Sequence, residues 1–271
     1  MQDGKIELSK NDITTNLPYD PRVSLAFDHH ESEMDRLKAV ETGGKLIIDP
    51  KARSAARVVY DYYGGKEAFP RISEDLMAAV DKGDSADFTM DEILDPKGWV
   101  LLHYLMDART GLGRFHHFRI SNYDLMMELI DYCLDHDIDE ILELPDVKER
   151  VELYFEQAEQ FKAQLRRIAQ VHDKVVVLDL RKEEVIHAGN RFMIYALYPE
   201  TEISVHVAWG FRKQNTAVMI GKSIVNKASQ VDIGELCLQY GGGGHRNAGT
   251  CQMDNDVVDE KLPDIIRALN G

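Results

Sequence analysis

The tripeptide Asp28-His29-His30 places a carboxylate and two imidazoles directly after the apolar run at 23–27. Ligands of open α/β sheets collect at the carboxyl ends of the strands, and imidazole together with carboxylate suits Mn²⁺, Fe²⁺ or Zn²⁺. A neighbouring carboxylate also fixes the tautomer of a histidine and raises its basicity. The tripeptide therefore predicts a metal site. The alternative is a strand end without a chemical role.

A second candidate is a run of four glycines followed by two basic residues. The residues are Gly241, Gly242, Gly243, Gly244, His245 and Arg246. Glycines let backbone N–H groups approach a phosphate closely, and the two basic side chains would add charge-assisted hydrogen bonds. The alternative is a mobile surface turn. It fits less well, because a helical pattern precedes the run and an extended one, at 248–251, follows it.

Two further segments carry weaker signals. Asp84 lies where a helical pattern ends, and it would be either a ligand in a tight turn or a structural turn residue. Residues 107–114, Asp-Ala-Arg-Thr-Gly-Leu-Gly-Arg, form a glycine-bearing basic loop. That loop would either face a phosphate or simply end a helix.

The first half of the chain alternates between extended and helical patterns. Runs at 13–15, 23–27 and 46–48 are bounded by turn-type residues and predict strands. Helices are predicted from Ser54, as an N-cap, to a stop at Gly64-Gly65, and at 72–80, 91–105 and 122–135. Strands that alternate with helices predict an α/β fold with a parallel sheet.

The second half has a different pattern. Apolar residues recur at steps of three and four through 147–172, without glycine or proline, which predicts a long helix. Beyond it, strands are predicted at 175–180, 192–197, 203–208 and 216–220, and helices at 232–239 and 257–269. We expect a metal-binding catalytic domain at 1–146, a connecting helix at 147–172, and a smaller α+β substrate-binding domain at 173–271.

The composition indicates where such a protein works. Of its 271 residues, 44% are hydrophobic and 29% charged, as in globular proteins. Three widely spaced cysteines, Cys133, Cys237 and Cys251, argue against a disulfide framework. No apolar run reaches the roughly 18 residues of a membrane span, and residues 1–5 show no signal-peptide character. We therefore expect a cytoplasmic protein with no membrane partner.

The formal net charge of −15 is unevenly distributed. Residues 173–271 contain 11 basic and 13 acidic residues, whereas residues 1–172 contain 21 and 34. An acidic surface repels long polyphosphate backbones, so we expect a small phosphorylated substrate rather than long nucleic acid. The uneven charge fits a solvated acidic surface. It also fits an acidic lobe that holds cations beside a near-neutral lobe that receives an anion.

Asp-His-His after a strand, with Gly-Gly-Gly-Gly-His far downstream, resembles the DHH phosphoesterase superfamily. The chain is most similar to exopolyphosphatase-like members with a DHH-associated C-terminal domain, over nearly its whole length. This resemblance implies two domains and a two-metal centre between them, usually with Mn²⁺ and alternatively with Mg²⁺. It also implies hydrolysis of phosphodiesters or phosphoanhydrides, as in the exonucleases, dinucleotide hydrolases and pyrophosphatases of the superfamily.

The resemblance assigns a role to each matched residue. His29 matches a metal-ligating histidine, Asp28 the acid that supports it, and His30 the histidine near the scissile phosphate. Asp28 and His30 are therefore the candidate catalytic residues. Asp84 matches a metal-ligating aspartate, for which Asp81 is the second choice. The glycine run, with the two basic residues after it, matches the loop that grips the substrate.

Two departures from the family pattern affect the metal site. The second motif normally has an aspartate where this chain has Asn16, whose amide can ligate a metal but brings no charge. Asp12 would replace it only if the strand is shifted. The first motif, a strand with paired aspartates, has no counterpart in residues 1–11. We expect that the chain is truncated at its start; the alternative is a divergent member with an incomplete metal site.

These features predict metal-dependent hydrolysis of a phosphodiester or phosphoanhydride in a short polyphosphate, a short oligonucleotide or a nucleotide. Divalent cations held by His29 and Asp84, with Asn16 as a further ligand, would activate the attacking water. The alternative is a non-catalytic nucleotide- or phosphate-binding sensor with an incomplete metal site. The sequence is compatible with a monomer or a homodimer.

Overall fold

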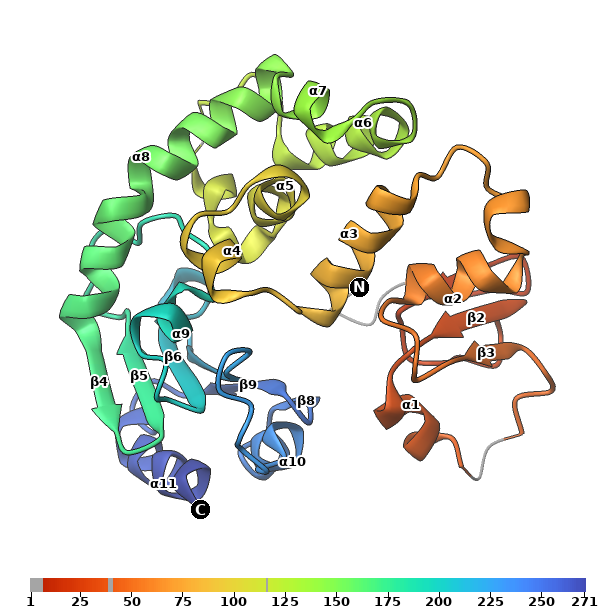
Figure 1. The fold of residues 1–271 in the computed structure, drawn as a ribbon. Coiled ribbons are helices and arrows are strands. Elements are labelled where there is room, and N and C mark those ends of the chain that lie inside the picture. Colours follow the sequence, from red (N-terminus) through yellow and green to blue (C-terminus); the bar gives the residue numbers. More distant parts are fainter. Residues whose placement is uncertain (1–6, 39–40, 116) are drawn as a thin grey trace. The chain divides into compact units, whose positions relative to one another are not determined.

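The computed structural model describes residues 7–38, 41–115 and 117–271 (Figure 1). Residues 1–5, in which no signal peptide is predicted, lie outside these ranges. The chain folds into two compact units, Met1–Asp87 and Phe88–Gly271, and each has its own sheet. These units are defined by packing, so the predicted domain limits at 146 and 172 stay predictions.

No helix in the described ranges is long and apolar enough to cross a membrane.

The first unit is built on a small parallel sheet. Its strands, in spatial order, are β1 (Ile13–Thr15), β2 (Leu25–Asp28) and β3 (Leu46–Ile48). Thr15 pairs with Phe27, and Asp28 pairs with Ile48. The three predicted strands and their parallel arrangement are confirmed. Asp28 therefore lies at the edge of the sheet where all three strands end.

Helices α2 and α3 position the residues around that edge. The ring of Phe27 in β2 lies 5.2 Å from the ring of Tyr62 in α2, so this helix packs against the sheet. The helix predicted from Ser54 is confirmed, including its cap. The helical elements of this unit are α1 (Glu31–Arg36), α2 (Ala55–Tyr62), the 3₁₀ helix η1 (Gly65–Glu67) and α3 (Glu74–Ser85).

Helix α3 is longer than its predicted span of 72–80. It continues through Gly83 to Ser85 and ends where Ala86 adopts a left-handed conformation, at φ 50°. The prediction that Asp84 lies in a tight turn is therefore wrong, because Asp84 belongs to the last helical turn. A single glycine weakens a helix by only about 1 kcal/mol relative to alanine, which is too little to end it here.

A buried carboxylate ties α3 to the start of α2. Asp81 accepts a hydrogen bond from Ser54 Oγ at 2.7 Å, and its Oδ2 lies 2.7 Å from Nη2 of Arg57. Ser54 also accepts a hydrogen bond from the backbone N–H of Arg57 and thereby caps α2. The Ser54 hydroxyl thus provides a hydrogen-bond acceptor for the start of α2 and a donor for the buried carboxylate of Asp81.

The second unit begins with helices. The patterns predicted at 91–105 and 122–135 are confirmed, the first as two helices separated at Pro96. The elements are α4 (Met90–Leu94), α5 (Gly98–Met106), η2 (Ala108–Thr110), η3 (Leu112–Arg114), α6 (Asn122–Asp135), α7 (Ile138–Leu142) and α8 (Pro145–Ile168).

The long helix ends earlier than predicted. Helix α8 stops at Ile168, and residues 169–172 form strand β4 (Ala169–His172) instead of a last helical turn. Asp173 takes a left-handed conformation, at φ 56°, and turns the chain directly into an antiparallel partner strand. Strand pairing supplies hydrogen-bond partners that the end of a helix would lack.

The second unit contains a six-stranded sheet in the order β4-β5-β6-β7-β9-β8. Its pairs are antiparallel except β5 with β6. The remaining strands are β5 (Val175–Asp179), β6 (Ile203–Trp209), β7 (Thr216–Lys222), β8 (Gly243–His245) and β9 (Ala248–Met253). Figure 1 shows α10 (Ile233–Gln239) and α11 (Val258–Asn270) on one side of this sheet.

One predicted strand of this unit is a helix. Residues 192–197 contain α9 (Met193–Leu197), not an extended segment. Asn190 begins the turn, because its side chain accepts from the backbone N–H of Phe192 and its carbonyl accepts from that of Met193. A short apolar run fits a strand or a buried helix equally well by periodicity, and the local turn decides between them.

Replacing Ser54 tests the link between α2 and α3. We expect Ser54→Ala to lower the free energy of unfolding by about 2 kcal/mol, because the helix cap and a partner of a buried carboxylate are lost together. Ser73→Ala is the matched control, since Ser73 caps α3 at an exposed site, and it should cost about 1 kcal/mol. Urea unfolding followed by circular dichroism measures both. Equal losses would contradict a special role for Ser54.

Candidate active site

The carboxylate of Asp28 organises the segment that follows β2. The side chain is buried, and its Oδ1 accepts hydrogen bonds from the backbone N–H groups of His29 at 2.7 Å and His30 at 3.0 Å. The same oxygen lies 2.7 Å from Nδ1 of His30. The carboxylate therefore fixes both the backbone of the two histidines and the ring of the second.

Asp28 and His30 shift each other's pKa. The hydrogen bond to Asp28 raises the pKa of His30 against the opposing effect of burial. Burial raises the pKa of Asp28, but hydrogen bonds from the His30 ring and the two backbone N–H groups outweigh it and hold that pKa below its usual value. The side chain of His30 is 34% exposed, so a ligand can reach the ring.

His29 is held in a different way. Its Nδ1 lies 3.2 Å from the carbonyl oxygen of Ala52, and a carbonyl can only accept, so Nδ1 carries the proton. The lone pair of Nε2 is buried and 3.2 Å from Oδ2 of Asp84, yet no described atom is aligned to form a hydrogen bond with it. A lone pair and a carboxylate at this distance repel each other unless a proton or a cation lies between them.

His29 and Asp84 fit a divalent cation. Two ligand atoms about 2.1 Å from a metal, at right angles to one another, are about 3 Å apart. The measured 3.2 Å separation matches that arrangement. Asp84 reaches this position from the last turn of α3, where its Oδ2 also lies 3.4 Å from the backbone N–H of Ala55. Asp81, the second choice, has both oxygens occupied by Ser54 and Arg57.

The other predicted ligands of this unit contribute less. Asn16 is exposed, follows β1 directly and has a left-handed backbone, at φ 58°. Asp12 caps a turn by accepting from the N–H and the hydroxyl of Ser9. No group of three or more potential histidine, cysteine or acidic ligands occurs within the described ranges. His29 and Asp84 are thus the two predicted ligands that this unit brings together.

The glycine run forms a tight turn and strand β8 after α10. Gly241 has a positive φ of 72°. A Cβ atom would lie 2.2 Å from the Thr250 carbonyl oxygen if added to Gly242, and 2.3 Å from the Ala248 carbonyl oxygen if added to Gly244. A Cβ atom on Gly243 would meet nothing within 4 Å. Gly242 and Gly244 have no room for a side chain, and Gly241 has open space but a left-handed backbone. Gly243 combines open space with an ordinary backbone conformation, so its open side is left to a ligand.

Lys222 is a basic residue near the glycine run that the sequence patterns do not reveal. It ends β7, and its backbone N–H donates to the carbonyl of Asn247. Burial lowers the pKa of Lys222, and the neighbouring positive charge of Arg246 lowers it further. Lys222 and Arg246 are thus neighbouring cations and form a basic site that suits a phosphate.

The basic loop predicted at 107–114 is partly structural. The terminal nitrogen Nη2 of Arg114 donates to the carbonyls of Ile186 at 3.0 Å and His187 at 3.3 Å. Its guanidinium also fills the space beside Gly111, where a Cβ atom would be 2.2 Å away. Arg114 therefore fastens the loop to the chain before α9. Arg109 at the start of the loop stays exposed.

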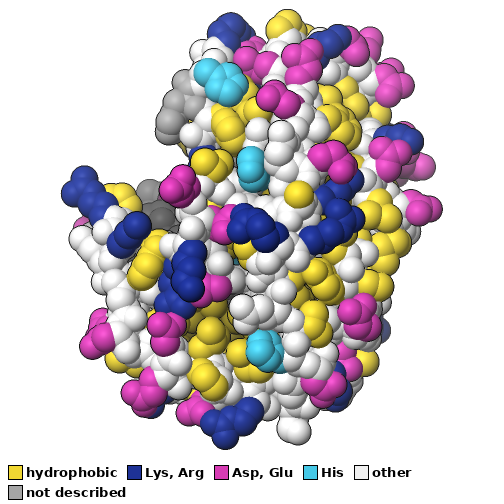
Figure 2. All heavy atoms as spheres, turned by 90° about the vertical axis from the view of Figure 1, so that its left-hand side faces the viewer, with side chains coloured by type: hydrophobic (Ala, Val, Ile, Leu, Met, Phe, Trp, Pro, Cys, Tyr) yellow, Lys and Arg dark blue, Asp and Glu magenta, His cyan; other side chains and the backbone are white. Residues whose placement is uncertain are grey.

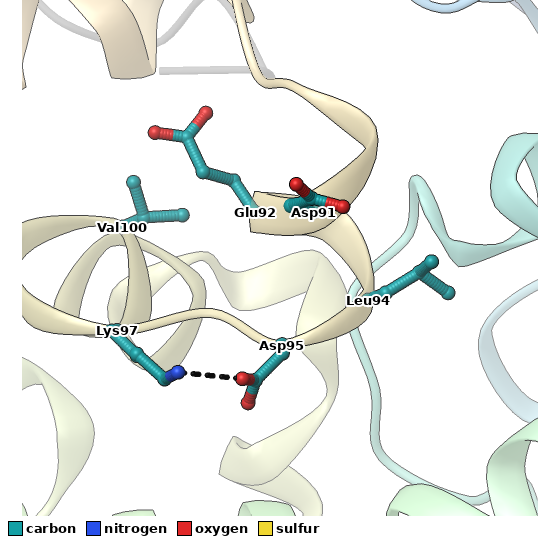
Figure 3. A pocket seen from close by; sticks show the side chains of 6 residues that line it. All are labelled: Asp91, Glu92, Leu94, Asp95, Lys97 and Val100. Atoms are coloured by element: carbon teal, nitrogen blue, oxygen red, sulfur yellow. Dashed lines mark ion pairs between the residues drawn. The ribbon is translucent and has the colours of Figure 1, made fainter.

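Residues of α4, α5 and the turn between them line an open pocket of about 510 Å³ (Figure 3). Its lining residues are Asp91, Glu92, Leu94, Asp95, Lys97 and Val100. Lys97 forms an ion pair with Asp95 at 2.7 Å, which reduces the charge of this acidic cavity. None of the predicted site residues lines it.

One comparison with solved structures identifies the family. A pGpG-specific phosphodiesterase, PggH from Vibrio cholerae, is 54% identical, with a TM-score of 0.79, over 99% of this chain and 87% of that chain. The chain belongs to the DHH phosphoesterase superfamily. It is thus a metal-dependent hydrolase, and the two-part α/β fold predicted from the DHH motif is confirmed.

Other DHH-related structures are far less similar. An exopolyphosphatase-related protein from Bacteroides fragilis is 15% identical over 91% of this chain and 65% of its own, with a TM-score of 0.46. The DHH domain of PF0399 is 15% identical over 92% and 68%, with a TM-score of 0.32. Neither value supports an argument about this chain. No family model and no curated protein matches the sequence.

The DHH segment makes a testable electrostatic pair. We expect Asp28→Asn to lower the pKa of His30 toward its usual value, because the hydrogen bond to the carboxylate is the main cause of its elevation. An NMR titration of the His30 ring in metal-free protein measures the change. Asp84→Asn is the control and should lower the pKa by less. The assignment fails if Asp84→Asn has the larger effect.

The glycines make a second test. Gly242→Ala should lower the free energy of unfolding by more than about 2 kcal/mol, since its methyl group would overlap a backbone carbonyl. Gly243→Ala should change it by less than about 0.5 kcal/mol but weaken binding of a nucleoside monophosphate. Denaturant unfolding and calorimetric titration distinguish the two variants. Equal instability of the two variants, or unchanged nucleotide binding by Gly243→Ala, would refute the structural role of Gly242 and the ligand-facing role of Gly243.

Proposed function

We propose that this protein is a Mn²⁺-dependent phosphodiesterase that hydrolyses short 5′-phosphorylated oligonucleotides, with the dinucleotide pGpG as the preferred substrate. The observation that carries this proposal is the 54% identity to a pGpG-specific phosphodiesterase over 99% of the chain. Because the identity is this high over nearly the whole chain, we propose the same class of substrate as well as the same class of reaction.

His29 and Asp84 are the proposed ligands of a divalent cation. The exposed amide of Asn16 is the next candidate, since Asn16 directly follows the strand paired with β2. A bound divalent cation supplies Lewis-acid stabilisation and lowers the pKa of its water. An imidazole ligand favours Mn²⁺ over Mg²⁺, which prefers oxygen ligands. We therefore propose Mn²⁺ as the working metal and Mg²⁺ as a weaker substitute.

His30 is the proposed electrophilic group. The hydrogen bond to Asp28 raises the pKa of His30 and so favours the protonated imidazole. A partly exposed imidazolium can stabilise charge on a phosphoryl oxygen or donate a proton to a departing one. Asp28 has the supporting role, because it orients the ring and favours its charged form.

In the second unit, the glycine run, His245, Arg246 and Lys222 are the proposed phosphate grip. Gly243 offers an unobstructed backbone, and the neighbouring cations Lys222 and Arg246 attract an anion. Figure 2 shows basic and acidic side chains interspersed over one face of the molecule, and the net charge is −15. This distribution favours a small anionic substrate as partner over a long nucleic acid.

A cytoplasmic location fits the cysteines. Cys133, Cys237 and Cys251 are all free thiols, and the latter two are buried close together, where Cys251 Sγ lies 3.5 Å from the Cys237 carbonyl oxygen. Neighbouring thiols that stay reduced are typical of a reducing compartment.

Two histidine variants separate the proposed roles. With pGpG and Mn²⁺, His29→Ala should lower kcat by more than about 100-fold, because a metal ligand is lost. His245→Ala should raise KM about tenfold and change kcat by less than about threefold, because a ground-state contact is lost. His172→Ala, on an exposed strand position, is the control and should match the wild type. Chromatography of the nucleotide products over a range of pGpG concentrations gives both kcat and KM.

The main alternative is a non-catalytic sensor of small nucleotides. Asn16 in place of a charged ligand, together with only two predicted ligands in contact, favours it. Tight calorimetric binding of pGpG, without turnover of any phosphodiester or phosphoanhydride in Mn²⁺ or Mg²⁺, would establish the sensor and refute the enzyme. Turnover that persists in His29→Ala would refute the assigned metal ligand.

A further inference from the structure

The sheet of the second unit has one covered face and one partly open face. Side chains of alternate residues point to opposite faces. Val205, Val218 and Cys251 lie on the face packed against α10 and α11, and all three are buried. The residues between them point to the other face, where β7, β9 and β8 carry mostly exposed or half-buried positions. We call this other face the open sheet face.

A row of paired residues crosses the open sheet face toward the glycine run. His206 of β6 pairs with Met219 of β7, Met219 with Thr250 of β9, and Thr250 with Gly243 of β8. Residues opposite one another on adjacent strands point to the same face. His206 and the open side of Gly243 therefore lie three strand spacings apart, about 14 Å, on the same face of the sheet.

Small side chains flank the row on the same face. Ala217 and Ala248 are two positions from its members along β7 and β9. Gly221 is a third such position, but the hydroxyl of Tyr195 lies over it. Met219 is 37% exposed in the middle of the row. A flat floor with one flexible thioether suits a planar base, because methionine adapts its shape to the surface that it contacts.

Arg109 and Arg191, which lies in the turn into α9, share one carboxylate. Asp107 accepts a hydrogen bond from Arg109 Nε at 2.8 Å through Oδ1, and its Oδ2 lies 3.3 Å from Nε of Arg191. The two terminal nitrogens of Arg191 have no hydrogen-bond partner among the described residues, and its side chain is 33% exposed. One carboxylate thus serves two guanidinium groups, and Arg191 keeps free donors.

Arg191 precedes a helix that packs on the same face as His206. Tyr195 of this helix hydrogen-bonds Ser204, two residues before His206, and donates to the Gly221 carbonyl. The guanidinium carbon of Arg191 lies 4.0 Å from the centroid of the Phe192 ring, in a cation–π contact. Burial and the positive charge of Arg191 lower the pKa of His206 to about 4. The imidazole is therefore neutral at neutral pH. It can accept a hydrogen bond at one nitrogen and donate at the other.

We propose that Arg191 and His206 form a subsite that recognises a guanine base of the substrate, on the open sheet face beyond the phosphate grip. Guanine presents two acceptors, O6 and N7, which match the paired donors of an arginine. Adenine presents an amino group in place of O6 and would leave an arginine donor unpaired. The distance to Gly243 suits one nucleotide extended along the sheet, with its phosphate at the glycine run.

A base explains this site better than a second phosphate does. A phosphate site concentrates charged donors around one point, whereas here Asp107 offsets one arginine and His206 is neutral. The flat row with Met219 offers contact area along the sheet instead of a pocket around a tetrahedral group. The subsite therefore fits the planar, neutral part of the ligand.

The experiment compares three dinucleotides: pGpG, pApA, and GpG, which lacks the 5′-phosphate. Arg191→Met should lower kcat/KM for pGpG about 10- to 100-fold and that for pApA by less than about threefold, so that the base preference collapses. His206→Ala should reduce the same preference. The difference between pGpG and GpG should persist in both variants, because the phosphate grip is intact.

Controls address folding and charge. Arg267→Met removes an exposed arginine from α11, on the covered side of the sheet, and should leave all three substrates unaffected. Arg191→Lys keeps the charge but loses the planar pair of donors, so the guanine preference should fall here too. This variant provides the test if Arg191→Met unfolds, which unfolding midpoints will show.

Two outcomes would overturn the proposal. One is an equal loss for pGpG and pApA in folded Arg191 variants, which would mean a role unrelated to the base. The other is loss of the difference between pGpG and GpG with base preference retained, which would mean a phosphate subsite. The proposal rests on the proposed function. If the wild type cleaves none of the three, that function fails, and calorimetric binding of pGpG against pApA to the same variants then decides the subsite.

Discussion

The chemistry of the first unit depends on burying one carboxylate at the end of a strand. An ionised carboxylate removed from water is strongly destabilised unless donors surround it. Asp28 satisfies this demand with two backbone N–H groups and one imidazole, all from the two residues that follow it. The chain has to turn sharply to provide them. That turn places His29 toward α3 and keeps His30 partly exposed.

A comparable constraint shapes the second unit, where pairing register rather than charge does the positioning. Antiparallel strands align His206, Met219, Thr250 and Gly243 although they are far apart in sequence. A slip of one residue would turn the whole set toward α10 and α11. The valines and isoleucine buried on that side hold the register. The hydrophobic core on one face therefore determines which polar groups meet on the other.

Local signals in the sequence were sufficient for much of this structure. Short β runs bounded by turn residues located β1, β2 and β3, and Ser54 located the start of α2. Errors arose where local patterns are ambiguous. The run at 192–197 is apolar in either conformation, and Asn190 decides for a helix through two hydrogen bonds that periodicity does not record. The end of α8 was missed because strand pairing with β5 competes with the last helical turn.

In the candidate site, too, some residues could be found from local sequence and others only from tertiary contacts. Asp28, His29 and His30 are adjacent in sequence, and their common site could be read directly. Asp81 and Asp84 lie on the same helix. Arg57 pairs with Asp81, so Asp84 is the acid that is left to approach His29. Lys222 and Arg191 could not have been found from spacing. Their neighbours, Arg246 and His206, become neighbours only through sheet register and loop packing.

The close packing of the glycine run has a consequence for how this family diversifies. Gly242 and Gly244 are held in place by backbone carbonyls of the adjoining strand, whether or not a ligand is bound. Selection for folding alone would preserve them in a descendant that had lost catalysis. Retention of this run in a related gene is therefore a record of ancestry and of a folded sheet. Drift toward new substrates should appear instead at Gly243 and along the open sheet face, where replacement leaves the scaffold undisturbed.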